Sequence, residues 1–134
     1  MGLDNGIIIK KSSASTGVKW IFEHLLKLDI THYDDGEYYD ICYWRKCSNI
    51  RNKIINNIGS PISEGTSPPL HKRNLCLIIK MLFKFNKHNW YEDGGSIWSF
   101  REFRYHLVTD MVKLTAIVLL MFVCKFDVFF YDSY

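Results

Sequence analysis

The chain has few prolines, scattered cysteines and none of the short motifs that mark several common enzyme classes. It contains three prolines and four cysteines in 134 residues. Cys42 and Cys47 are separated by four residues, whereas zinc knuckles and redox-active dithiols separate their cysteines by about two. There is no Gly-x-Ser-x-Gly elbow, no His-Glu-x-x-His pair and no glycine-rich phosphate loop. We therefore expect no metal, no cofactor and no catalytic residue of these kinds.

Signals for export and for membrane insertion are also missing. The segment Met1–Asp4 is not a basic stretch followed by a long apolar one. Gly6 occupies the position at which N-myristoylation needs serine or threonine. The apolar segment Leu114–Cys124 has eleven residues, about half the length that crosses a bilayer. We expect this segment to be a buried helix of the protein core, with no membrane partner, in a reducing cytoplasm.

The composition is that of one folded domain. Hydrophobic residues make up 48% of the chain and aromatic residues 16%, and this length is enough for one sizeable core. No internal repeat or low-complexity tract divides the chain. We expect a single domain over residues 1–134, with a proline-containing loop at about residues 60–73.

The pattern of apolar residues predicts four strands and four helices. The strands are expected at residues 6–10, 30–33, 38–44 and 126–131. The helices are expected at about residues 18–28, 48–58, 74–87 and 99–124, the last capped by Ser99. In strand 38–44, Tyr43 is expected on the same face as Ile41, and Trp44 on the opposite face. The predicted fold class is α+β, a small, mostly antiparallel sheet of about four strands packed against three or four helices.

The strongest functional signal lies where the charge along the chain reverses. Residues 31–44 contain four acidic and no basic residues, whereas residues 45–87 contain nine basic residues and one acidic residue. Arg45 and Lys46 stand at this boundary, between a predicted strand and a predicted helix. The first N–H groups of a helix have no partner within it and carry partial positive charge, so this junction suits an anion.

Neighbouring residues extend this candidate site. Arg51, about one turn into the predicted helix, can add a third cation, and Tyr43 and Trp44 can stack on a base or a sugar ring. The candidate ligand-binding residues are therefore Tyr43, Trp44, Arg45, Lys46 and Arg51.

Polar residues near both ends of the chain can support the same site. The possible supporting residues are Asp4, Asn5, Asp132 and Tyr134. If the first and last strands are neighbours in the sheet, these residues lie near the edge that holds Arg45. A structural interpretation stays open, in which the cations pair with nearby acids such as Asp40 and the terminal polar residues form turns and caps.

Three segments occur in order along the chain: Met1-Gly2-Leu3-Asp4-Asn5-Gly6, Tyr43-Trp44-Arg45-Lys46 and Phe130-Tyr131-Asp132-Ser133-Tyr134. Together they resemble a family of small, uncharacterised proteins found in bacteriophages and in prophages of low-GC bacteria. This family offers no activity that can be transferred. The resemblance therefore implies a viral protein in a host cytoplasm and nothing about its chemistry.

These observations favour a non-enzymatic accessory protein that binds an anionic ligand or a host partner, and so inhibits or sequesters a host (defence) factor. The basic region 45–87 is the expected surface for a host protein, a nucleotide or a nucleic acid. One alternative is a small enzyme for a phosphate-containing substrate, with Asp4 or Asp132 as base and Arg45 stabilising charge. Another is a structural or oligomerising protein with a tyrosine- and tryptophan-rich surface.

Overall fold

The computed structural model describes residues 4–33, 36–45, 48–58, 65–85 and 99–133. Its strands are β1 (Asp4–Lys10), β2 (Asp29–Tyr33), β3 (Gly36–Arg45), β4 (Gly65–Pro69) and β5 (Val128–Ser133). Its longer helices are α2 (Ser48–Ile58), α3 (Lys72–Phe83) and α5 (Phe100–Met121). A short 3-10 turn, η1 (Lys11–Ser13), precedes α1 (Thr16–Trp20), which continues into the π-helical turn η2 (Ile21–Leu25).

The five strands form one antiparallel sheet in the order β2-β3-β1-β5-β4. The predicted α+β class with a mostly antiparallel sheet is confirmed. The additional strand, β4, lies within the segment that was predicted to be a loop, so that prediction is wrong for Gly65–Pro69. Prolines obscured it, because a proline cannot donate a ladder hydrogen bond. β4 is an edge strand, where such residues are tolerated.

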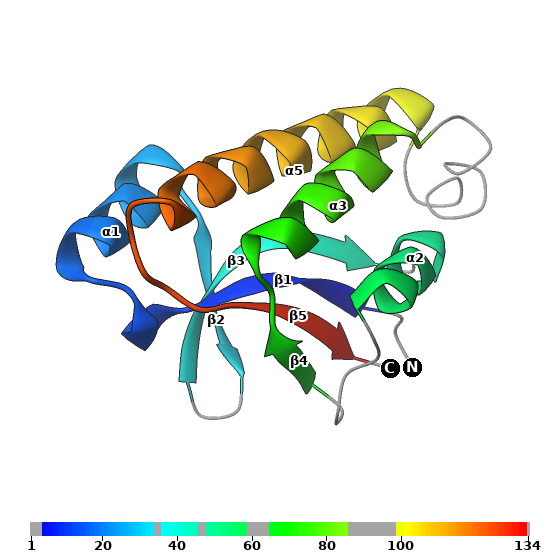
Figure 1. Cartoon of the computed structure of the whole chain (residues 1–134). Helices are drawn as coiled ribbons and strands as arrows, with labels where there is room; N and C mark the ends of the chain where they lie inside the picture. The colour runs from blue at the N-terminus through cyan, green and yellow to red at the C-terminus, as the bar shows by residue number, and fades with distance from the viewer. Residues whose placement is uncertain (1–3, 34–35, 46–47, 59–64, 86–98, 134) are drawn as a thin grey trace.

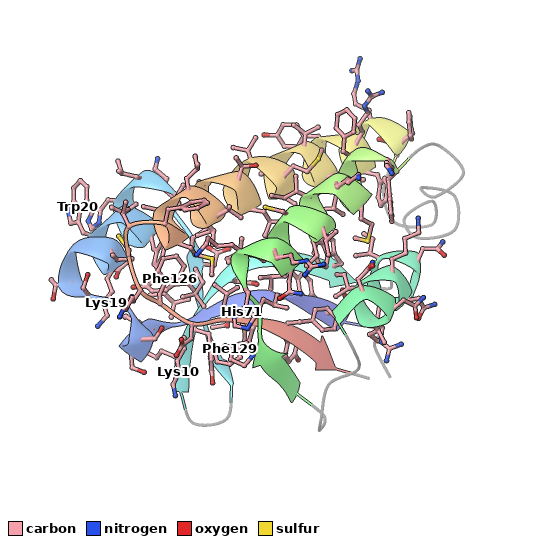
Figure 2. The ribbon with its side chains drawn as sticks, in the orientation of Figure 1. Lys10, Lys19, Trp20, His71, Phe126 and Phe129 are labelled. Atoms are coloured by element: carbon pink, nitrogen blue, oxygen red, sulfur yellow. The ribbon has the colours of Figure 1, made fainter. Side chains whose placement is uncertain are left out.

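Helices α1, α3 and α5 cover one face of the sheet, and α2 lies beside the end at which β1 begins (Figure 1). The hydrophobic core fills the space between this helical layer and the sheet. Ile7 and Ile9 contribute to it from the central strand β1. Phe22 on η2 meets the rings of Tyr39 and Phe126 edge-on, with centroids 5.3 and 5.2 Å apart. Figure 2 shows Phe126 between the helices and the sheet.

A β-bulge in β3 changes which of its side chains face the core. The pairing of β1 with β3 shifts between Ile7 and Ile8, and Ile41 is the extra residue. Ile41 and Cys42 are therefore both buried although they are adjacent. Tyr43 consequently turns to solvent, with 44% of its surface exposed. The prediction that Tyr43 shares a face with Ile41 is wrong because the extra residue breaks the two-residue alternation.

α5 begins as predicted but is buried on one face only. Ser99 is its N-cap, and the Ser99 hydroxyl accepts the N–H of Glu102 at 3.2 Å. Leu114 and Ile117 are buried in the core, whereas Leu119 remains exposed. The predicted core helix over Leu114–Cys124 is therefore confirmed for its core-facing residues and wrong for Leu119, Phe122 and Val123, which are exposed; the helix itself ends at Met121. None of the helices in the described ranges is long and apolar enough to cross a membrane.

Candidate ligand-binding site at one end of the sheet

The central strand β1 brings together the three segments on which the sequence analysis rests. Its neighbours are β3 on one side and β5 on the other. Asp4 pairs with Arg45 and with Ser133, and Asn5 pairs with Trp44 and with Asp132. Neighbouring strands lie about 4.8 Å apart, so the start of β1 and the ends of β3 and β5 form one edge of the sheet. The first and last strands are thus neighbours, which was the condition for a shared site.

Helix α2 starts at the same end of the sheet. It begins at Ser48, three residues after Arg45, and has eleven residues. Arg51 lies in its first turn and is half-buried. Lys46 and Tyr134 lie outside the described residues, and for Asp4, Arg45 and Asp132 the structure describes the backbone positions. The predicted strand-to-helix junction is therefore present around Arg45.

Asn5 is the most unusual residue of this region. Its exposed fraction is 0%, and within the described part of the chain neither amide atom, Nδ2 or Oδ1, has a hydrogen-bond partner. Paired residues of antiparallel strands project to the same face, so Asn5 lies on the same face as Trp44, toward the helices. A buried amide without partners costs about 1–3 kcal/mol. In folded proteins a buried amide of this kind takes an ordered water or a ligand as its partner.

Trp44 has a structural role. It is 1% exposed, and its indole Nε1–H donates a hydrogen bond of 2.8 Å to Oδ2 of Asp110 on α5. This bond links the sheet to the helical layer across the core. Because the ring is enclosed, Trp44 cannot stack on a ligand that approaches from solvent. The expected role of Trp44 as a stacking group is therefore wrong.

Asp110 is a buried carboxyl group that the sequence analysis did not single out. It is 5% exposed, and burial raises its pKa to about 7, while the hydrogen bond from Trp44 and the charge of Lys113 act in the opposite direction. One sequence signal marks it. Asp110 occurs where the core-facing spacing of α5, set by Leu107 and Leu114, calls for an apolar residue.

A second carboxyl group with a raised pKa lies nearby on β3. Burial and the charge of Asp29, which pairs with Asp40 across β2 and β3, raise the pKa of Asp40 to about 6. Burial also raises the pKa of the Cys42 thiol, so Cys42 is an inert core residue and not a nucleophile. Among the described residues, no group of three or more histidine, cysteine, aspartate or glutamate side chains could hold a metal ion.

The opposite face of β1 carries a close backbone contact. Gly6 pairs with Tyr43 on β3 and with Tyr131 on β5. A Cβ atom at Gly6 would collide with the carbonyl oxygen of Cys42. Glycine is therefore required at this position by the path of the bulged strand. Because Gly6 has no side chain, Tyr43 on β3 and Tyr131 on β5 flank a position on β1 that carries none.

Comparisons with protein-family models, with curated proteins and with solved structures find no match. The resemblance to bacteriophage proteins therefore stays a prediction from three short segments. The fold and the arrangement where β1 begins are the observations from which a function can be proposed.

Proposed function

We propose that this protein is a non-enzymatic binding module whose anionic ligand sits where β1 begins and β3 and β5 end. The observation that carries this proposal is the fully buried, unpartnered amide of Asn5 in that position. The amide can donate through Nδ2 and accept through Oδ1. Asn5 is as enclosed as Trp44, so a ligand group reaches it only when the side chains that cover it move, and it would then remove the cost of leaving both atoms unpaired.

Positive charge for the ligand comes from the junction that follows β3. Arg45 offers a planar pair of donors suited to phosphate or carboxylate. Lys46 and Arg51 are the further candidate cations, and the first turn of α2 adds N–H groups and the positive end of the helix dipole. Tyr43, which is 44% exposed, lies on the opposite face of the sheet from Asn5, so it is a candidate for stacking only on a ligand that extends around the end of the strands.

The acidic residues at the same end of the sheet narrow the choice of ligand. Asp4 and Asp132 pair with residues on β3 and β1, next to Arg45 and Asn5. Two carboxylates would weaken the binding of a bare phosphate, whereas they can accept hydrogen bonds from a ligand that also carries donors. We therefore favour a nucleotide-like ligand, with an anionic group and hydrogen-bond donors, over an inorganic anion.

In a viral setting, this binding would sequester a host (defence) factor or its nucleotide in the host cytoplasm. The support is the resemblance of three segments, which the fold places on adjacent strands. A small enzyme is the second candidate, because Asp4 pairs with Arg45 and could act as a base beside a stabilising cation. Turnover of a nucleotide that is lost in Asp4→Asn would favour the enzyme.

The proposal is tested by native mass spectrometry of the purified protein, followed by calorimetric titration with a panel of nucleotides. We expect Asn5→Leu and the double variant Arg45→Glu/Lys46→Glu to lose binding. Asn5→Leu should be at least as stable as the ligand-free wild type, because it removes a buried amide that has no partner. Folded variants that bind as the wild type does would refute the assignment.

The control is a second adjacent Lys-Arg pair. Lys72 and Arg73 begin α3 and are exposed, so Lys72→Glu/Arg73→Glu makes the same change in net charge away from the site. This variant should bind the nucleotide normally. Equal loss in both double variants would show that overall charge, and not the junction after β3, determines binding.

A further inference from the structure

α5 is apolar on two opposite faces, and only one of them faces the core. The residues of the core face are Phe103, Leu107, Asp110, Leu114 and Ile117. The opposite face carries a row of exposed side chains, which the C-cap residue Phe122 continues beyond the helix; this row, here called the α5 stripe, is formed by Tyr105, Val108, Val112, Thr115, Leu119 and Phe122. Figure 2 shows side chains that rise from α5 on the side away from the sheet.

The spacing of the α5 stripe is that of a seam between paired helices. Its members follow one another in alternating steps of three and four residues, which is the heptad pattern of helices that pack side by side. An isolated surface helix would carry polar residues on this face. The stripe instead runs along nearly the whole of α5, about five turns.

The exposed area is close to what a stable interface needs. The five apolar members of the α5 stripe expose between 47% and 72% of their surfaces. These fractions correspond to roughly 650 Å² of residue surface, backbone and the tyrosine hydroxyl included, against the ~800 Å² per partner of a standard interface. The largest apolar patch of a typical monomer is about 300–600 Å². A face of this size on one helix indicates an interface.

We propose that the α5 stripe packs against the α5 stripe of a second copy, with the two helices antiparallel. A two-fold axis that passes between positions 113 and 114 brings all six members into register. The resulting layers pair Tyr105 with the partner's Phe122, Val108 with the partner's Leu119, and Val112 with the partner's Thr115. The small residues in the middle allow the helices to approach closely, and the large aromatic residues close both ends.

The surroundings of the stripe suit this arrangement. A shallow groove of about 430 Å³ lies beside Tyr105 and includes Val108 and Arg104. It lies where the two-fold axis brings the partner's Phe122, and Arg104 can then lie over that ring. Within one copy, Lys72 Nζ is 5.1 Å from the centroid of Phe122. That ring is still 68% exposed, so it remains available to a partner.

Antiparallel packing also matches the charges of the helix ends. Arg101 and Arg104 lie in the first turns of α5. In the antiparallel pair they approach the C-terminal end of the partner's α5, where the last carbonyl groups carry partial negative charge. Parallel packing would instead place the arginines of both copies side by side. The helix dipole therefore favours the antiparallel pair, and Lys72, which lies beside Phe122 at that end, opposes it in part.

Sedimentation velocity across micromolar to near-millimolar concentrations tests the proposal. The wild type should form a dimer, and Val112→Glu/Leu119→Glu should weaken dimerisation by about 100-fold or more, because charges would be enclosed in the interface. The matched control, Leu25→Glu/Leu77→Glu, changes two exposed apolar residues outside α5 and should dimerise normally. A wild type that stays monomeric, or a dimer that survives the α5 changes, would overturn the proposal.

Two further measurements complete the test. If the glutamate variant loses its circular dichroism, Val112→Ala/Leu119→Ala, which shortens two side chains that are mostly exposed, should still weaken the dimer at least tenfold. Orientation is tested by oxidative crosslinking in a background with Cys47, Cys76 and Cys124 replaced by serine. Tyr105→Cys mixed with Phe122→Cys should crosslink efficiently. Efficient crosslinking of Tyr105→Cys with itself would refute the antiparallel arrangement. Loss of dimerisation without loss of nucleotide binding would separate this surface from the proposed ligand site.

Discussion

The buried carboxyl group of Asp110 makes the stability of this protein depend on pH in an uncommon direction. Burial raises the pKa of Asp110 from its ordinary 3.8 to about 7 in the folded protein. Between these two values the folded chain holds a proton that the unfolded chain has released. The free energy of unfolding therefore decreases as the pH rises from about 4 to about 7. Asp40, whose pKa is raised to about 6, contributes with the same sign.

The size of the effect follows from the shift of the Asp110 pKa. A change of about three pH units at about 1.4 kcal/mol per unit amounts to about 4 kcal/mol. Asp110 is 5% exposed, so solvent screens little of this energy. A domain of this size has a total stability of about 5–15 kcal/mol. The deprotonation of the Asp110 carboxyl group should therefore remove a large share of the total free energy of unfolding.

Urea unfolding at several pH values between 5 and 8, followed by tryptophan fluorescence, measures this dependence. Asp110→Asn cannot ionise but keeps an oxygen that can accept the Nε1–H of Trp44. We expect its stability to decrease much less with rising pH than that of the wild type, with the decrease due to Asp40 remaining, and to exceed that of the wild type at pH 8. Asp127→Asn, a change at an exposed residue, should retain the wild-type profile. A wild type with stability that is constant or increases over this range would refute the reasoning.

Two further pairs of variants test the packing of the sheet, each by urea unfolding at a fixed pH. Gly6→Ala should lower the free energy of unfolding by roughly 3 kcal/mol because the added methyl meets the carbonyl oxygen of Cys42. Gly17→Ala, in α1 with open space around it, should instead raise that free energy by up to about 1 kcal/mol. Trp44→Phe should cost about 1–3 kcal/mol because the carboxyl group of Asp110 loses its donor. Trp20→Phe, at a ring that projects from the outer end of α1 (Figure 2), should change stability by less than about 0.5 kcal/mol. Equal effects within either pair would contradict the packing argument.

Local signals in the sequence were sufficient for most of the elements. Short runs of apolar and aromatic residues predicted strands at 30–33 and 38–44, where β2 and β3 lie, and Ser99 marked the start of α5. These features depend on residues that are close in sequence, such as a strand pattern or a cap. The α+β class followed from them because it needs only the types of the elements and not their pairing.

The register of the sheet could not be predicted, because it depends on contacts between distant residues. The bulge at Ile41 exists because β3 must pair with β1, which begins more than thirty residues earlier. The sequence around Ile41 alternates in a regular way and contains no turn residue that marks a bulge. The burial of Trp44 and the exposure of Tyr43 follow from that bulge. Two of the five candidate ligand-binding residues thus owe their positions to a feature without a local signal.

The sequence also could not predict which apolar residues of α5 face the core and which face solvent. Periodicity identifies a helix that is apolar on most sides, but it cannot tell which apolar residues meet the protein's own core. Leu114 and Leu119 are indistinguishable by residue type, yet the first is buried and the second is 62% exposed. Only the placement of α5 on the sheet separates the core face from the α5 stripe.

The bulge in β3 also links the stability of the core to the proposed binding site. Gly6 allows the backbone of Cys42 to approach β1 closely, and the extra residue then turns Trp44 toward Asp110. Arg45, the next residue, is the last of β3 and pairs with Asp4 at the end of the sheet. The hydrogen bond of Trp44 therefore fixes the point from which Arg45 and α2 depart. The candidate site beside Asn5 is held in place by a core contact, and a ligand would meet a strand end that is already positioned by the fold.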